Sequence, residues 1–176
     1  MQIEMKRLLS IIGAISLLGT STTNVVACNA PQEYTSEELK ELKEKNKIDT
    51  ADENIKNNLE WIAPQEKPFN TVDNKWYYVV WRSNEKDNWR IVKFKSDNFK
   101  TIDKFNNFEL QFFPPKNKVI YGLLIGEKQD WGYKPIKIWI DDKNNSHFKS
   151  VYRWNLDTQE PDLVVDNEGN IKVNEE

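Results

Sequence analysis

Cysteine and histidine are almost missing from this chain of 176 residues, which contains one of each, Cys28 and His147. A single cysteine cannot form an internal disulfide, and a zinc site needs several cysteine or histidine ligands. A catalytic triad needs its histidine beside a nucleophile, but His147 follows a polar stretch of turn-forming residues, where a solvated loop position is the simplest interpretation. We therefore expect no disulfide framework, no zinc centre and no histidine-dependent nucleophile.

Signatures of nucleotide, nucleic-acid and calcium binding are also missing. With only 6 glycines, the chain has no Walker A or Rossmann glycine pattern. The formal net charge is -3 and no basic stretch stands out, which argues against a nucleic-acid partner. Two acidic stretches, 141–145 and 166–170, lack the ligand spacing of an EF-hand and fit ordinary turns. We therefore predict no cofactor and no metal site.

Aromatic residues, in contrast, are abundant, at 12% of the sequence with 7 tryptophans. This is too much bulky apolar surface for a disordered chain, so the sequence predicts a folded core. The remaining enzymatic possibility is a pair of carboxylates that converges only in the fold, because sequence spacing does not reveal such pairs.

The first 27 residues have the features of an export signal. Lys6 and Arg7 form a short positive segment, and residues 8–18 form an uncharged apolar run. This run is shorter than the roughly 20 residues that a membrane-spanning helix needs, but it fits the apolar region of a signal peptide. Translation could start at Met1 or at Met5, and a start at Met5 gives the cleaner signal.

The apolar run is followed by Val25-Val26-Ala27-Cys28, which resembles the lipobox of bacterial lipoproteins. The resemblance implies attachment of lipid to the sulfur of Cys28 and signal cleavage between Ala27 and Cys28. Two acyl chains anchor a protein stably, whereas one binds only reversibly. The alternative is an ordinary signal-peptidase site with an incidental cysteine. We expect the mature protein on the extracellular face of the cell membrane, held there by lipid on Cys28.

A wider resemblance covers much of the chain. Residues 5–28 resemble lipoprotein signals of the mollicutes, the wall-less bacteria with AT-rich genomes. Three stretches of the mature part, 32–48, 57–70 and 151–174, are similar to a family of small lipoproteins from spiroplasma-type mollicutes. The resemblance implies a location and no activity.

Residues 29–63 predict a polar tether and two short helices. Thr35 and Glu38 fit a capping box that opens the first helix, and a second box starts at Thr50. Apolar residues recur at helical spacing in the second helix, which Pro64 should end. These residues are Ile55, Leu59 and Ile62. Because apolar side chains are few, we interpret the segment as a solvated stalk with one face docked on the β domain, and we expect the rest of the chain not to need it for folding. The alternative is a coil that binds a partner.

From Trp76 onward the sequence predicts β-strands. The clearest hairpin joins residues 76–81 to 89–95 through a polar turn, and a second hairpin signal surrounds the turn 167–170. Other strand candidates are 108–113, 119–125, 136–140 and 150–156, and 99–107 fits either a loop or a helical turn. We predict an α+β fold, in which an N-terminal helical segment precedes an antiparallel β domain. The expected parts are a signal peptide (1–27), a lipidated tether (28–35), the helical segment (36–63) and the β domain (64–176).

The strand 76–81 is aromatic on both faces. Alternation places Trp76 and Tyr78 on one face and Tyr77 and Trp81 on the other, whereas a free-standing sheet would carry polar residues on its solvated side. Either this is a central strand covered on both faces, the interpretation we favour, or one face is an exposed platform. Trp76, Tyr78 and Trp81 are the candidate ligand platform, and we expect at least one of them to be partly exposed.

These observations favour a lipid-anchored cell-surface protein that is a non-enzymatic binding module for an extracellular glycan or protein. Two alternatives remain. One is a membrane-anchored hydrolase with carboxylates that converge in the fold, and the other is an accessory subunit that binds a membrane complex through residues 36–62.

The lipid anchor can be tested by replacing its cysteine. Cys28→Ser removes the sulfur that would accept the lipid, so the signal should stay uncleaved or the protein should be released. Phase partitioning in a cloud-point detergent should then shift from the detergent phase to the aqueous phase. Unchanged partitioning in the variant would rule out lipid on Cys28.

Overall fold

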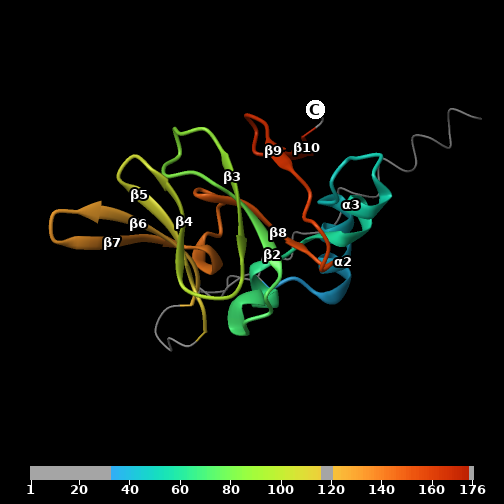
Figure 1. Ribbon diagram of the computed structural model, residues 1–176, viewed down its shortest axis with the longest axis horizontal. Helices are drawn as coiled ribbons and strands as arrows, with labels where there is room; N and C mark the ends of the chain where they lie inside the picture. Colours follow the sequence, from blue (N-terminus) through green and yellow to red (C-terminus); the bar gives the residue numbers. More distant parts are fainter. Residues whose placement is uncertain (1–32, 116–120, 175–176) are drawn as a thin grey trace, which may run out of the picture. The chain divides into compact units, whose positions relative to one another are not determined.

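Two four-stranded antiparallel sheets and one β-hairpin make up most of this protein (Figure 1). The computed structural model describes residues 33–115 and 121–174, so Ala27, Cys28 and the expected signal peptide lie outside the described residues. The first sheet has the order β1 (Leu59–Trp61), β8 (Phe148–Trp154), β2 (Trp76–Trp81), β3 (Arg90–Lys95). The second has the order β4 (Lys100–Phe105), β5 (Phe108–Phe113), β6 (Gly122–Gln129), β7 (Gly132–Ile138). The C-terminal hairpin pairs β9 (Leu163–Val165) with β10 (Ile171–Val173).

Short helices accompany these strands. Among the described residues, the α-helices are α2 (Ser36–Lys45) and α3 (Glu53–Asn58), and the 3-10 turns are η1 (Pro64–Glu66), η2 (Pro68–Asn70) and η3 (Trp139–Asp141). The fold is therefore mostly antiparallel β-sheet with a few short helices. The ambiguous stretch 99–107 contains a strand, β4, that pairs with β5. The strand expected at 136–140 differs from the structure at both ends. β7 already starts at Gly132, and residues 139 and 140 belong to η3 instead of to a strand.

The aromatic strand β2 is covered on both faces. Tyr77, Val79 and Trp81 belong to a core cluster that the second sheet completes, and all three side chains are fully buried. Tyr78 and Val80 belong to a separate cluster on the opposite face of the first sheet. The remaining buried members of the first cluster are Ile62, Phe69, Phe94, Leu110, Phe112, Leu123, Ile125, Trp139, Phe148 and Val151. Those of the second are Ile48, Ile55, Leu59, Tyr152, Trp154, Leu163 and Ile171. The covered-strand interpretation is confirmed.

A capping box opens α2, as the spacing of Thr35 and Glu38 predicted. The Glu38 carboxylate accepts a hydrogen bond from the Thr35 backbone N–H at 2.8 Å, and the Thr35 hydroxyl accepts one from the Glu38 N–H at 3.2 Å. The second helix departs from the prediction at both ends. Asp52, rather than Thr50, caps α3, and the helix stops at Asn58.

Residues 59–62 depart from the expected helix, because they supply a strand to the first sheet. Leu59 and Trp61 pair with Trp154 and Tyr152 of β8, and the Ile62 N–H donates to the Val151 carbonyl at 2.9 Å. Residues 59–62 on the helical side of the expected boundary at 63 thus bond with a strand on its other side. The spacing of Ile55, Leu59 and Ile62 is typical of a helix. Residues 59–61 form a strand instead, because they pair with β8, which lies almost a hundred residues later in the chain.

The contribution of β1 can be measured with Leu59→Ala. Leu59 is 3% exposed, so its truncation should reduce the free energy of unfolding by ~2–4 kcal/mol in urea titrations. The control Leu39→Ala, in α2, which has no buried residues, should cost less than ~1 kcal/mol. A chain beginning at Ala63 should lose its cooperative transition. A cooperative transition of undiminished stability in that chain would support the stalk interpretation.

Candidate functional site

The three residues of the expected platform do not form one surface. Trp81 and Tyr78 are 0% and 2% exposed and point to opposite faces of β2, because alternate residues of a strand do so. The Trp81 indole N–H donates to the Asp103 carboxylate at 3.1 Å, and the Tyr78 hydroxyl donates to the Pro161 carbonyl. Only Trp76 stays partly exposed, as we expected of at least one ring. Tyr78 and Trp81 are thus core residues with satisfied polar groups.

The only histidine and the first acidic loop form a backbone clamp. The buried carboxylate of Asp142 accepts N–H bonds from Ser146, His147 and Phe148 at 3.1, 2.8 and 2.7 Å, and so fixes the start of β8. Burial acts to raise the pKa of Asp142, but the bond from the Ser146 hydroxyl at 2.7 Å and the three N–H bonds outweigh it and lower the pKa. The His147 Nδ1 lies 3.3 Å from the Arg82 carbonyl oxygen. Asp142 thus uses its oxygens for backbone donors that organise a loop.

The second acidic loop is a turn between β9 and β10. One Asp166 oxygen accepts N–H bonds from Glu168 and Asn170, both at 2.9 Å, and Gly169 adopts a φ of +87°. Within residues 33–115 and 121–174, no group of three or more histidine, cysteine, aspartate or glutamate side chains is arranged to hold a metal ion.

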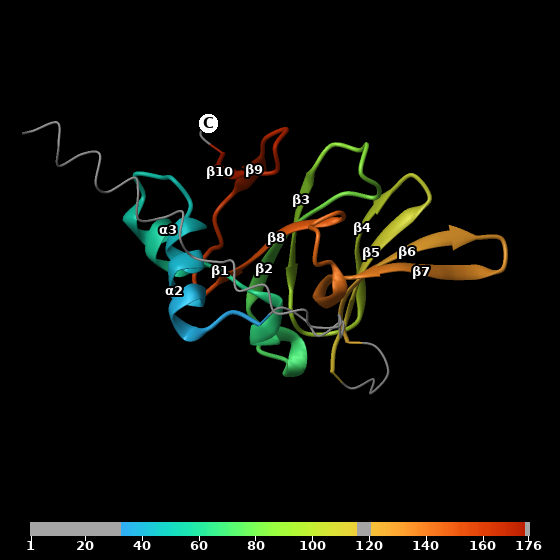
Figure 2. The same cartoon turned by 180° about the vertical axis from the view of Figure 1, so that it is seen from behind.

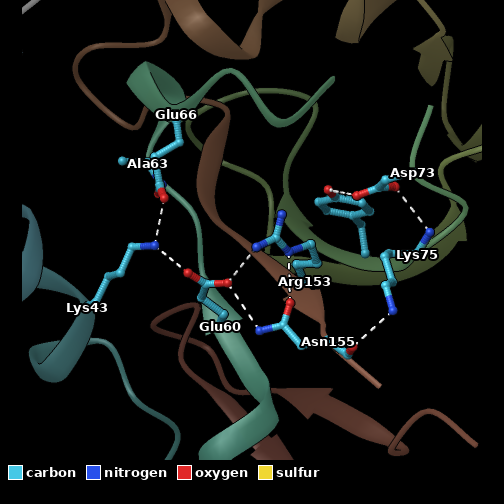
Figure 3. Close-up of polar contacts among 9 residues, drawn as sticks. Lys43, Glu60, Ala63, Glu66, Asp73, Lys75, Arg153 and Asn155 are labelled. Atoms are coloured by element: carbon cyan, nitrogen blue, oxygen red, sulfur yellow. Dashed lines mark hydrogen bonds and ion pairs between the residues drawn. The ribbon is translucent and has the colours of Figure 1, made fainter. Parts of the chain in front are cut away.

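A dense polar network joins α2 to the first sheet (Figure 3). Lys43 of α2 binds the carboxylate of Glu60 in β1, and its Nζ lies 2.6 Å from a Glu66 oxygen in η1. The other Glu60 oxygen accepts bonds from Arg153 at 2.8 Å and from Asn155 at 3.1 Å. Figure 2 shows α2 and β1 side by side, where this network links them.

The electrostatics of this network indicate a structural role. Burial acts to raise the pKa of Glu60, but the bonds from Lys43, Asn155 and Arg153 outweigh it and hold the pKa below its ordinary value. Burial acts to lower the pKa of Lys43, but the carboxylates of Glu60 and Glu66 outweigh it and raise the pKa. A general acid needs a carboxyl pKa that is raised toward neutral pH, and Glu60 moves the opposite way. The network is therefore a charged clamp.

The most exposed aromatic side chain is at the tip of the β6–β7 hairpin. β6 and β7 pair up to Gln129 and Gly132, so Asp130 and Trp131 form a two-residue turn. The Trp131 side chain is fully exposed, and Tyr133, two residues later, is 50% exposed. In Figure 1 this hairpin extends beyond the other strands of its sheet. The sequence does contain a signal for this exposure, because Trp131 has only polar residues and glycine on either side from Glu127 to Gly132.

A polar centre lies near this hairpin on the second sheet. Glu109 of β5 is 5% exposed and accepts hydrogen bonds from Gln111 at 3.1 Å and Thr101 at 3.3 Å, and Lys104 forms an ion pair with it at 3.0 Å. Burial acts to raise the pKa of Glu109, but bonds from Lys104, Tyr133 and Gln111 outweigh it and lower the pKa. The bond from Tyr133 fixes one exposed ring against the sheet.

Comparison of this chain with protein-family models, with curated proteins and with solved structures gives no match. Across the part of the chain that the structure describes, no helix has the length and apolar character needed to cross a membrane.

The charged clamp predicts a pH dependence of stability. Because folding lowers the pKa of Glu60, its contribution is complete above the pKa of the unfolded chain and is lost as the pH falls through the lower pKa of the folded chain. Glu60→Gln should cost ~1–2 kcal/mol at pH 7 and should flatten this loss in urea titrations at several pH values. The control is Glu53→Gln, whose ion pair with Lys56 is on the exposed surface. An unchanged pH profile in Glu60→Gln would contradict the clamp.

Proposed function

We propose that the mature chain is a lipid-anchored protein of the outer face of the cell membrane, and that its β-sheets form a non-enzymatic module that binds an extracellular glycan or protein. The anchor part of the proposal is supported by Val25-Val26-Ala27-Cys28 after an apolar run, and by the resemblance to small lipoproteins of spiroplasma-type mollicutes. These features point to location and leave the binding role to be argued from the fold.

The binding part rests on one observation, the full exposure of Trp131 at the tip of a hairpin. A tryptophan has about 200 Å² or more to bury, and tryptophans are enriched among the residues that dominate binding energies. The strands that carry Trp131 are paired along their length, so the ring is presented on a fixed support. A supported ring loses little conformational freedom when it binds.

The accessory-subunit alternative is disfavoured by the position of its expected contact residues. Ile55, Leu59 and Ile62 were the apolar stripe that a membrane partner would cover, and all three are buried within this chain. The hydrolase alternative needs a carboxyl group with a raised pKa as its general acid. The pKa values of Glu60, Glu109 and Asp142 are all lowered, which does not support this alternative.

The proposal is tested by Trp131→Ala in the full chain. Binding to an array of extracellular glycans and a panel of immobilised matrix proteins should fall at least ~10-fold for the recognised member, while the melting midpoint stays unchanged. The matched control is Phe99→Ala, another exposed aromatic, which packs on Phe113 at 4.9 Å between ring centroids. Equal binding by wild type and Trp131→Ala, or the same loss in the control, would refute a role for the hairpin tip.

A further inference from the structure

A hollow of about 520 Å³ opens where three distant segments meet. Its walls are the loop 45–50 after α2, the beginning of β8 from Lys149 to Tyr152, and residues 166–173 of the C-terminal hairpin. This volume lies within the range of small-molecule sites, about 300–1,000 Å³. The hollow is on the opposite side of the first sheet from the second sheet and is thus separate from the β6–β7 hairpin.

The lining of the hollow is positively charged although the chain as a whole carries -3. Four lysines, Lys45, Lys47, Lys149 and Lys172, stand against two aspartates, Asp49 and Asp166, so the lining has a formal charge of +2. Asp166 already accepts two backbone N–H bonds in its turn, and it lies 3.7 Å from the Lys172 ammonium. The polar residues Asn46 and Ser150 complete the walls, and the Asn46 amide already donates to the Leu42 carbonyl at 2.8 Å.

Two of the four ammonium groups are uncommitted. Lys47 pairs with Glu44 at 2.8 Å and Lys172 with Asp166, but neither Lys45 nor Lys149 forms an ion pair with any residue in the described ranges. Lysines that line a concavity without a protein counter-ion attract a soluble anion, and low-dielectric walls strengthen that attraction.

The position of Lys149 is determined by the fold around it. A Cβ atom on Gly169 would come within 3.0 Å of the Lys149 Cγ, so the aliphatic stem of the lysine lies directly against the glycine backbone. The buried Tyr152 donates its hydroxyl proton to the Asn46 carbonyl at 3.1 Å, which connects the loop 45–50 to β8. Loop, strand and hairpin are thus held together around the hollow.

We propose that this hollow binds a phosphate ester. A tetrahedral oxyanion presents acceptors in several directions, which matches lysines contributed by three separate segments, and lysine binds phosphate as a point charge. The phosphate could belong to a small soluble molecule or to the headgroup of an anionic lipid, and both sources present the same group to Lys45 and Lys149.

The experiment uses the full chain in detergent and, as probes, inorganic phosphate, glycerol 3-phosphate and reconstituted vesicles. Phosphate or glycerol 3-phosphate should raise the melting midpoint of the wild type and should bind in titration calorimetry. The variant Lys45→Gln/Lys149→Gln should bind at least ~10-fold more weakly, with an unchanged midpoint when no probe is present. Lys128→Gln/Lys134→Gln, which removes the same charge from the β6–β7 hairpin, is the matched control and should bind as the wild type does.

The outcomes separate the two sources and the two proposals. Binding of the soluble probes supports a site for small phosphate esters. A lipid headgroup is supported if the soluble probes do not bind but the wild type is retained more strongly on phosphatidylglycerol than on phosphatidylcholine vesicles. This difference should be lost only in Lys45→Gln/Lys149→Gln. No binding to any probe, or equal loss in both double variants, overturns the proposal. Because Trp131 is intact throughout, none of these results tests the role of the hairpin tip.

Discussion

Burial of both faces of β2 is the constraint on which the rest of this structure depends. A strand with large apolar side chains on each face is stable only between two layers, since every exposed aromatic ring would forfeit its burial free energy. The second sheet covers Tyr77 and Trp81, while the C-terminal hairpin and residues 48–59 cover Tyr78 and Val80. The strand order with β2 inside the first sheet follows from this demand.

The same demand explains why residues 36–63 belong to the folded unit. The chain is charge-rich and has few aliphatic residues to spare, so Ile48, Ile55 and Leu59 are needed over the second face of β2. The clamp of Lys43 and Glu60 then joins α2 to this layer. Such a partly buried pair adds little net stability compared with apolar contacts, but removal of one partner leaves the other charge uncompensated. Its main effect is to fix where α2 lies.

Because the core takes up most of the aromatic residues, the aromatic groups left on the surface are informative. The fully exposed Trp131 is at the end of the second sheet, whereas the lysine-lined hollow lies against the other side of the first sheet. The two surfaces differ in chemistry, one aromatic and one cationic. The proposed functions of the two surfaces therefore do not depend on each other.

Local features of this protein were determined by its sequence alone. The hairpin 76–95, the turn at 167–170 and the capping box of Thr35 rest on neighbouring residues, so alternation and turn chemistry predicted them. Other features exist only through tertiary contacts. Strand β1 has three residues and is defined by its pairing with β8, Glu60 meets Arg153 across 93 positions, and the hollow needs segments from both ends of the described chain. Short-range patterns carry no information about such pairings, because their free energy arises only when distant segments come together.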